Sequence, residues 1–216
     1  VGEAQRVQVH SLPMLRVEGA DYSARAAIAL AGLSTGITAT GDATLRADDL
    51  ARYADLAGRP LAGRAFLTIS GETALLAGTF DATGRVQGEG MKIGQPEVDN
   101  LLSGSAKIDF ALRRDETGTT LRQLDLRAAS LTARAAGTLA TAGSDLTAQV
   151  DFTDLSALGG AWRGGVTGLA HIIGTAETGT ISFDATGNGL GMGIAEVDGL
   201  LRGPSTIALM ADYADQ

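Results

Sequence analysis

The sequence predicts an all-β protein, an elongated and curled antiparallel sheet that forms a repeating β-groove with a few one-to-two-turn helices. Two observations carry this prediction. Apolar and polar residues alternate over much of the chain, which is the pattern of strands with one apolar face. The chain also repeats itself with a period of about 100 residues, which is typical of arrays. With 30 glycines and only 4% aromatic residues, the composition suits thin β layers better than a compact aromatic core.

The repeat is clearest in one phrase of eleven residues. GQPEVDNLLSG at 94–104 returns as GIAEVDGLLRG at 193–203, with seven identical positions and an offset of 99. Three shorter matches keep the same order: SARAA with TARAA (23–27, 132–136), DL (49–50, 154–155) and FDATG (80–84, 183–187). The offsets fall from 109 to 99, which we interpret as small loop deletions. The repeat predicts one unit over 1–104, a second over 105–203, and the start of a third at 204–216.

The second unit shows the alternation most clearly. Strands are predicted over 106–112, 121–128, 131–137, 145–152, 168–174 and 180–187, separated by Gly/Asp/Thr turns suited to antiparallel hairpins. Each strand has one apolar side. We assign ten residues to a shared apolar inner face: Ile108, Phe110, Leu124, Leu126, Leu131, Leu146, Val150, Phe152, Ile181 and Phe183.

Helical signals are confined to two kinds of short segment. ADDLARYADLAG at 47–58 has Asp48 or Asp49 as a cap and Gly58 as a stop. In 96–104, Pro96 suits a first helical position and Gly104 could take a left-handed closing conformation, with Val98, Leu101 and Leu102 on one side. We therefore expect small plugs between strands.

A sheet with one apolar face must cover that face. The predicted helices are too few and too short to do so, which leaves two arrangements. In one, two sheets pack together as a closed sandwich. In the other, which we favour, a single sheet of roughly ten to twelve strands, about 50 Å long at ~4.8 Å per strand, curls around an open apolar trough. Such a trough is a plausible track for acyl chains, although alternation does not reveal which face is inward.

Several function classes are disfavoured. The net charge of −8 and the lack of a Lys/Arg cluster argue against nucleic-acid binding. With no cysteine, thiolate zinc sites and cysteine nucleophiles are excluded, and His10 and His171 have no partner at metal-binding spacing. We therefore expect no metal and no cofactor.

An enzyme is also disfavoured. The carboxylates of Glu97 and Asp99 recur as Glu196 and Asp198, and a catalytic pair rarely recurs in every structural unit. GNGLGMG at 187–193 lacks the long helix and the lysine of a phosphate-binding loop, so we interpret its glycines as turn or strand-edge residues. We expect no catalytic residue.

Five phrases of the sequence carry a family resemblance: LRQLDLRAASLTARAAG, DLTAQVDFTDLSAL, FDATG, EVDxLLxG, and LAGRPLAGRA at 56–65. Through them the chain resembles the TamB family of proteobacterial envelope proteins, particularly its alphaproteobacterial type. The resemblance covers nearly the whole chain and extends to AsmA-like and bridge-like lipid-transfer proteins. It implies a β-taco fold and a periplasmic protein anchored in the inner membrane by a helix outside this chain. It also implies a TamA-like outer-membrane barrel as partner, contacted through parts absent here, and roles in glycerophospholipid transport and outer-membrane protein assembly or secretion.

The alternative is a structural or adhesive β-solenoid segment of a secreted, autotransporter-like protein. Such segments are also rich in Gly, Thr and Ala, but their rungs repeat every ~20–30 residues rather than every 100. No run approaches the ~20 apolar residues that cross a bilayer, and the chain opens and closes within its pattern. We therefore expect it to be an internal piece of a longer protein.

Overall fold

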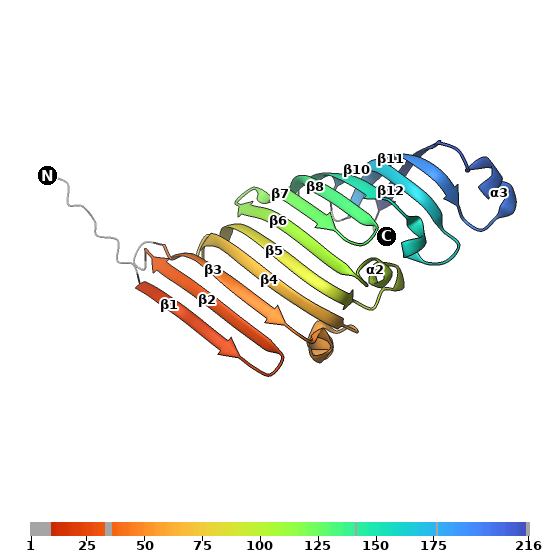
Figure 1. Ribbon diagram of the computed structural model, residues 1–216. Helices are drawn as coiled ribbons and strands as arrows, with labels where there is room; N and C mark the ends of the chain where they lie inside the picture. Colours follow the sequence, from red (N-terminus) through yellow and green to blue (C-terminus); the bar gives the residue numbers. More distant parts are fainter. Residues whose placement is uncertain (1–9, 33–35, 141, 176, 215–216) are drawn as a thin grey trace.

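The protein is an all-β, elongated, curled antiparallel sheet, here described from a computed structural model over residues 10–32, 36–140, 142–175 and 177–214. All twelve strands lie in one sheet in their sequence order, each hydrogen-bonded to its neighbours in the chain (Figure 1). The strands are β1 (His10–Glu18), β2 (Tyr22–Ala31), β3 (Thr38–Ala47), β4 (Ala62–Ala74), β5 (Thr79–Lys92), β6 (Ser105–Asp115), β7 (Gly118–Arg127), β8 (Leu131–Leu139), β9 (Ser144–Phe152), β10 (Arg163–Gly174), β11 (Thr178–Gly191) and β12 (Ser205–Ala214).

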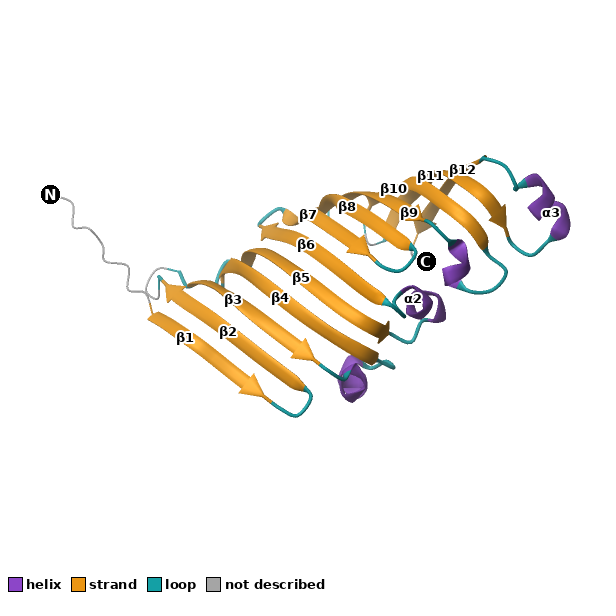
Figure 2. Ribbon diagram, in the orientation of Figure 1, coloured by secondary structure: helices purple, strands orange, loops and turns teal. Residues whose placement is uncertain are grey.

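The helical segments all lie along one edge of the sheet (Figure 2). Connections that follow an odd-numbered strand meet at this edge because every strand pairing is antiparallel. Four of these connections carry short helices, while the even-numbered strands end at the opposite edge of the sheet. The helical segments are η1 (Leu50–Tyr53), α1 (Ala54–Ala57), α2 (Pro96–Leu101), η2 (Leu155–Leu158) and α3 (Ala195–Leu200).

The local signals for η1 and α1 are confirmed. Asp49 caps η1 by accepting a hydrogen bond from the backbone N–H of Ala51 at 3.0 Å, and Asp154 caps η2 in the same way. Gly58 ends α1 at φ 63°, a left-handed conformation that glycine adopts without strain. Pro96 opens α2 as predicted. The closing role of Gly104 was predicted wrongly: Leu102 is the C-cap of α2, and Gly104 has no positive φ.

The sheet curls strongly between β6 and β9. Four strands separate α2 from η2, a distance of about 19 Å along a flat sheet at ~4.8 Å per strand. Yet α2 and η2 lie in contact, with Cα atoms within 8 Å of each other. The side chain of Asn100 in α2 reaches Gly159 at the end of η2. The contact buries Leu101. Curling brings the two helices together, so that each covers part of the other.

No closed core forms in the described part of the chain. Its buried hydrophobic residues are few and mostly small, and no large side chain there is fully buried. The accessible surface is 13931 Å², whereas a compact protein of 21.9 kDa would expose about 9,300 Å². A second sheet is absent from these residues, so the sandwich is not formed by them and one sheet face stays uncovered.

Equivalent positions in the two halves adopt matching irregularities. Gly63 and Gly164 sit at φ 90° and 88°, each at a register shift where the helix-bearing edge meets the next strand. On β1 the register shifts between Leu12 and Leu15, and on β7 it shifts between Leu121 and Leu124, an offset of 109 in both cases. β1 thus corresponds to β7, as the SARAA and TARAA phrases suggest for the strands that follow.

The FDATG phrase does not occupy equivalent places. Gly94 and Gly193 precede α2 and α3 with φ 80° and 83°, and fix the alignment of β5 with β11. Phe80 lies 14 residues before Gly94, whereas Phe183 lies 10 residues before Gly193. Both strands are continuous over 14 residues, so no loop was deleted between the phrases. The loop-deletion interpretation is wrong for this stretch. The phrase has moved four residues along the strand, an even number that keeps each side chain on its face.

Candidate functional site

The ten residues assigned from sequence to an inner face do share one face of the sheet. Ile108 pairs with Leu126 and Phe110 with Leu124 across β6 and β7. The same face continues through Leu131 opposite Phe152, then through Val150 and Leu146 of β9 to β10. It reaches Ile181 and Phe183 through their partners in β10. Cross-strand partners project from the same side of a pleated sheet, so these residues form one continuous apolar face.

The same face extends beyond the residues assigned from sequence, in both directions. Toward the N-terminus it includes Ile28, Leu45 and Ile69, and toward the C-terminus Ile207 and Leu209. The alternation in ARAAIAL at 24–30 and in FLTIS at 66–70 carries the signal that could have found them.

Two aromatic rings shape this face by lying over glycines. A Cβ atom at Gly84 would stand 2.4 Å from Cζ of Phe110, and one at Gly168 would stand 2.9 Å from Cε2 of Phe183. Each ring therefore occupies the space above a neighbouring strand where a side chain would otherwise project. Because glycine has no side chain, the backbone at these two positions leaves room for a ring to lie across it.

A hollow of about 450 Å³ lies on the apolar face across β2 to β6, and its surface is almost wholly apolar. Of the ten residues assigned from the sequence to the inner face, Phe110 lines this hollow. Ile28, Ile69, Phe80 and Leu112 line it as well and were not among those ten residues. Its size is within the range of small-molecule sites. Its walls offer apolar contact and few polar partners, as an acyl chain would require.

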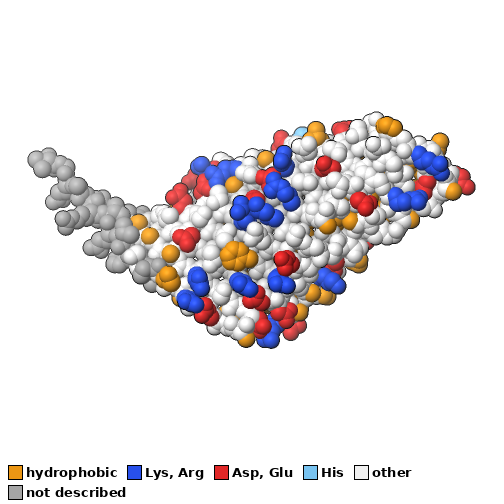
Figure 3. Space-filling model, viewed as in Figure 1, with side chains coloured by type: hydrophobic (Ala, Val, Ile, Leu, Met, Phe, Trp, Pro, Cys, Tyr) orange, Lys and Arg blue, Asp and Glu red, His pale blue; other side chains and the backbone are white. Residues whose placement is uncertain are grey.

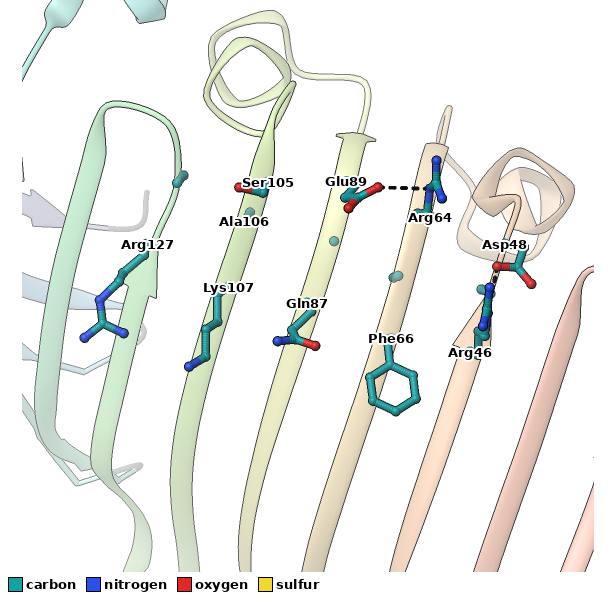
Figure 4. A pocket seen from close by; sticks show the side chains of 14 residues that line it. Arg46, Asp48, Arg64, Phe66, Gln87, Glu89, Ser105, Ala106, Lys107 and Arg127 are labelled. Atoms are coloured by element: carbon teal, nitrogen blue, oxygen red, sulfur yellow. Dashed lines mark hydrogen bonds and ion pairs between the residues drawn. The ribbon is translucent and has the colours of Figure 1, made fainter.

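The opposite face carries charges of both signs, visible as mixed blue and red side chains in Figure 3. A second hollow, of about 730 Å³, lies there near the helix-bearing edge (Figure 4). Five successive strands contribute side chains to its lining, namely Arg46, Phe66, Gln87, Lys107 and Arg127. This face is not uniformly polar, since Phe66, Leu169 and Ile173 are exposed on it. Sequence reasoning had not identified this second hollow.

Ion pairs cross the strands of this charged face. Arg85 pairs with Asp109, which Lys107 also contacts at 3.1 Å. The hydrogen bond from Arg85 holds the pKa of the Asp109 carboxyl below its ordinary value. Arg122, the extra residue of the β7 bulge, reaches Asp81 two strands away, with Nη1 and Oδ2 2.9 Å apart. Exposed pairs of this kind contribute little individually, and oppositely charged cross-strand pairs favour the observed register.

The repeated aspartates have structural partners. Asp99 accepts a hydrogen bond from the backbone N–H of Ile93 at 2.6 Å, and Asp198 accepts one from Met192 at 2.7 Å. The Met192 N–H, supported by Arg163, holds the pKa of Asp198 below its ordinary value. Both aspartates fasten the loop before a short helix back onto that helix. The EVDxLLxG phrase therefore carries a loop anchor, and this anchor accounts for its repeated aspartate.

The two histidines lie in strands. His171 in β10 stands 2.7 Å from Asp145 of β9, Nε2 to Oδ1, on the charged face. His10 begins β1. No group of three or more His, Cys, Asp or Glu within the described ranges has the geometry to hold a metal ion. In the same residues no helix is long and apolar enough to span a bilayer.

An assignment of function to this chain depends on its fold and its apolar face, because comparisons with known proteins found no match. No protein-family model, no curated protein and no solved structure matches this chain.

Proposed function

We propose that the apolar face binds the acyl chains of glycerophospholipids, as part of a TamB-like periplasmic protein that moves lipid between the inner and outer membranes. One observation carries the proposal: the apolar face is continuous across the sheet and no second layer covers it in the described residues. Uncovered apolar surface of this extent marks a binding surface in a folded protein.

The energetics favour acyl chains over headgroups as the bound part. Each methylene group removed from water contributes about 0.8 kcal/mol, so a chain of several methylenes in contact with the face supplies enough energy for binding. The net charge of −8 gives no general attraction for anionic headgroups. The headgroup is therefore expected to remain in water while the chains lie along the sheet.

The wider assignment rests on the sequence resemblance to the TamB family. It includes a periplasmic location, an inner-membrane anchor outside this chain, a TamA-like barrel as partner, and support of outer-membrane protein assembly or secretion. The single curled sheet supports this assignment in a general way, since that family is built as a β-taco. We propose no catalytic activity.

The β-solenoid alternative is less favoured by the architecture. A solenoid coils through parallel rungs, whereas all the strand pairings described here are antiparallel between chain neighbours. A solenoid interior is also packed shut, and this sheet leaves one face open. In a structural or adhesive protein, the open apolar face would therefore have to serve a purpose other than binding acyl chains.

Photo-crosslinking tests the acyl-chain proposal. Benzoylphenylalanine at Leu126, Val150 or Phe183 should capture lipid from vesicles of phosphatidylethanolamine and phosphatidylglycerol. The matched controls are Arg127 and Gln149, sequence neighbours whose side chains project from the opposite face. We expect at least ten-fold more lipid adduct at the first set. Equal labelling of the two sets would refute the proposal.

A competition arm separates acyl-chain binding from headgroup binding. A short-chain diacyl phosphatidylcholine should reduce the adducts at Val150 and Phe183, because it competes for the apolar face. Glycerol phosphate should not. Loss of labelling with glycerol phosphate would show that the headgroup is the bound part and would contradict the proposal.

A further inference from the structure

One charged residue lies on the apolar face. Among the paired strand residues that the structure describes, Arg114 of β6 is the one Lys, Arg, Asp or Glu that falls on this face. Its cross-strand partners are Phe80 of β5 and Thr119 of β7. Leu112 and Phe110 precede it on the same side of β6. A lone cation on an otherwise apolar face is a candidate binding group, because charged side chains are rarely placed among apolar ones without a partner.

Arg114 stands at one corner of the apolar hollow. The hollow of about 450 Å³ extends across β2 to β6, and both Phe80 and Leu112 line it. Phe80 is the direct cross-strand partner of Arg114. Because β6 ends at Asp115, Arg114 lies next to the edge of the sheet opposite the helices (Figure 1). The hollow therefore has an apolar interior and a cation at its border with water.

The guanidinium of Arg114 is available to an anion. Its side chain is exposed, and it makes no hydrogen bond or ion pair with the residues that the structure describes. The carboxylate that follows it in sequence is already engaged. Asp115 accepts hydrogen bonds from the backbone N–H of Thr117 at 2.9 Å and from the Thr117 hydroxyl. Asp115 also lies 3.9 Å from Arg113, which projects from the opposite face.

The repeat does not require a cation at this place. The equivalent residue after the next EVDxLLxG phrase is Tyr213, 99 positions later. The Tyr213 hydroxyl donates a hydrogen bond to the backbone carbonyl of Thr175 at 2.7 Å, so that side chain has a structural partner. Arg114 forms no such bond within the described part of the chain, and a bound anion would supply its partner.

We propose that Arg114 binds the phosphate of an amphiphile whose acyl chain lies in the adjoining hollow. This inference rests on the acyl-chain binding proposed above, and it adds the place and the orientation of the headgroup. A guanidinium presents several N–H donors in a planar fork that suits phosphate oxygens, and the Thr119 hydroxyl lies directly opposite on the same face as a further donor. The phosphate stays at the wet edge of the sheet, and the chain extends from it over Phe80 toward β2.

The expected effect is selectivity rather than high affinity. The chain supplies most of the binding energy, because apolar burial grows with each methylene group. An ion pair at an exposed edge contributes little in water and is screened by salt. We therefore expect the phosphate to improve binding about three- to five-fold through Arg114. This improvement should disappear at about 1 M salt, where the Debye length is ~3 Å.

Two lipids that differ only in the phosphate-containing headgroup test the proposal. Benzoylphenylalanine at Ile69, inside the hollow, should form adducts with both dioctanoyl phosphatidylglycerol and dioctanoylglycerol. The half-saturating lipid concentration is measured for each. Arg114→Gln should raise this concentration about three- to five-fold for phosphatidylglycerol and leave it unchanged for dioctanoylglycerol.

Arg113→Gln is the matched control, because it removes the neighbouring cation from the opposite face and should change neither lipid. Both arginines are exposed, so both variants should fold, and their melting temperatures check this. Equal effects of the two substitutions on phosphatidylglycerol would mean that only the overall charge matters, and would overturn the proposal.

The remaining outcomes separate this inference from acyl-chain binding itself. If neither lipid labels position 69, the hollow binds no acyl chain and both proposals are wrong. If both lipids label it and Arg114→Gln affects them equally, acyl-chain binding stands and the phosphate contact is refuted; Arg114 then only covers Phe80. Glycerol phosphate at the same concentration should not displace phosphatidylglycerol. If it does, the site binds a free phosphate ester and the inferred amphiphile is wrong.

Discussion

The ring of Phe110 lies across the backbone of Gly84 on the neighbouring strand, so close that a Cβ atom at position 84 would stand 2.4 Å from Cζ of the ring. The two residues are direct cross-strand partners of β5 and β6. Because no closed core forms in the described ranges, this contact matters as a place where a large side chain is held against the backbone of a neighbouring strand. The apolar face is therefore shaped by glycine positions as well as by its large residues.

Gly84→Ala should destabilise the fold by about 1–3 kcal/mol, because the added methyl forces the Phe110 ring and the strand apart. Chemical denaturation measures the change. Gly104→Ala is the matched control: nothing lies within 4 Å of its added Cβ, and its change should stay within about 0.5 kcal/mol. Phe110→Ala combined with Gly84→Ala should cost less than the sum of the single changes. Simple additivity would show that the ring does not occupy this space.

Leu101→Ala and Leu200→Ala should differ sharply although the residues hold equivalent positions. Leu101 is buried between α2 and η2, so its truncation should cost about 2–3 kcal/mol in the free energy of unfolding. Leu200 is exposed, so its truncation should change stability by less than about 0.5 kcal/mol when measured on the monomer. Similar losses at both positions would mean that α2 gains nothing from η2.

Asp198→Asn should lower the melting temperature at pH 7 and have less effect in acid. The pKa of Asp198 is lowered in the folded chain, chiefly by the hydrogen bond from the Met192 N–H. A carboxyl with a lowered folded pKa stabilises the fold above its unfolded value near 4, and this contribution is lost as the pH falls through the folded pKa. The melting temperatures of the two proteins should therefore converge below about pH 4.

Glu196→Gln is the control for that pH series. Glu196 lies in the same short helix, and its carboxylate accepts no hydrogen bond from the residues described in the structure. Its melting curve should follow that of the unmodified chain at every pH. A constant gap between Asp198→Asn and the unmodified chain from pH 7 to pH 3 would mean that the ionised carboxylate does not hold the loop.

Phe152→Arg should destabilise the sheet by about 2 kcal/mol, because it removes an aromatic ring from between Leu131 and Val166 and sets a charge on the apolar face. Gln149→Arg is the matched change on the charged face of the same strand and should be nearly neutral. Thermal unfolding distinguishes the two. An unchanged melting temperature for Phe152→Arg would show that position 152 is open to water.

The sequence alone determined which residues share a face. Alternation has a period of two and so does the pleat of a strand, so Leu126, Val150 and Phe183 could be assigned to one side without coordinates. Helix caps could also be predicted, because the Ala51 N–H donates to the Asp49 carboxylate within a span of three residues. The chain's period followed from EVDxLLxG, whose aspartates each anchor a local loop.

Only the tertiary structure decided how the strands were aligned and what covered them. The bulge at Arg122 and the four-residue displacement of FDATG depend on the neighbouring strand, which local patterns do not specify. Alternation is the same in a sandwich as in an open sheet, and pairing within one sheet distinguished them. The contrast between Leu101 and Leu200 is likewise a property of position in the array, because equivalent helices are buried or exposed according to whether a neighbouring helical segment curls back to meet them.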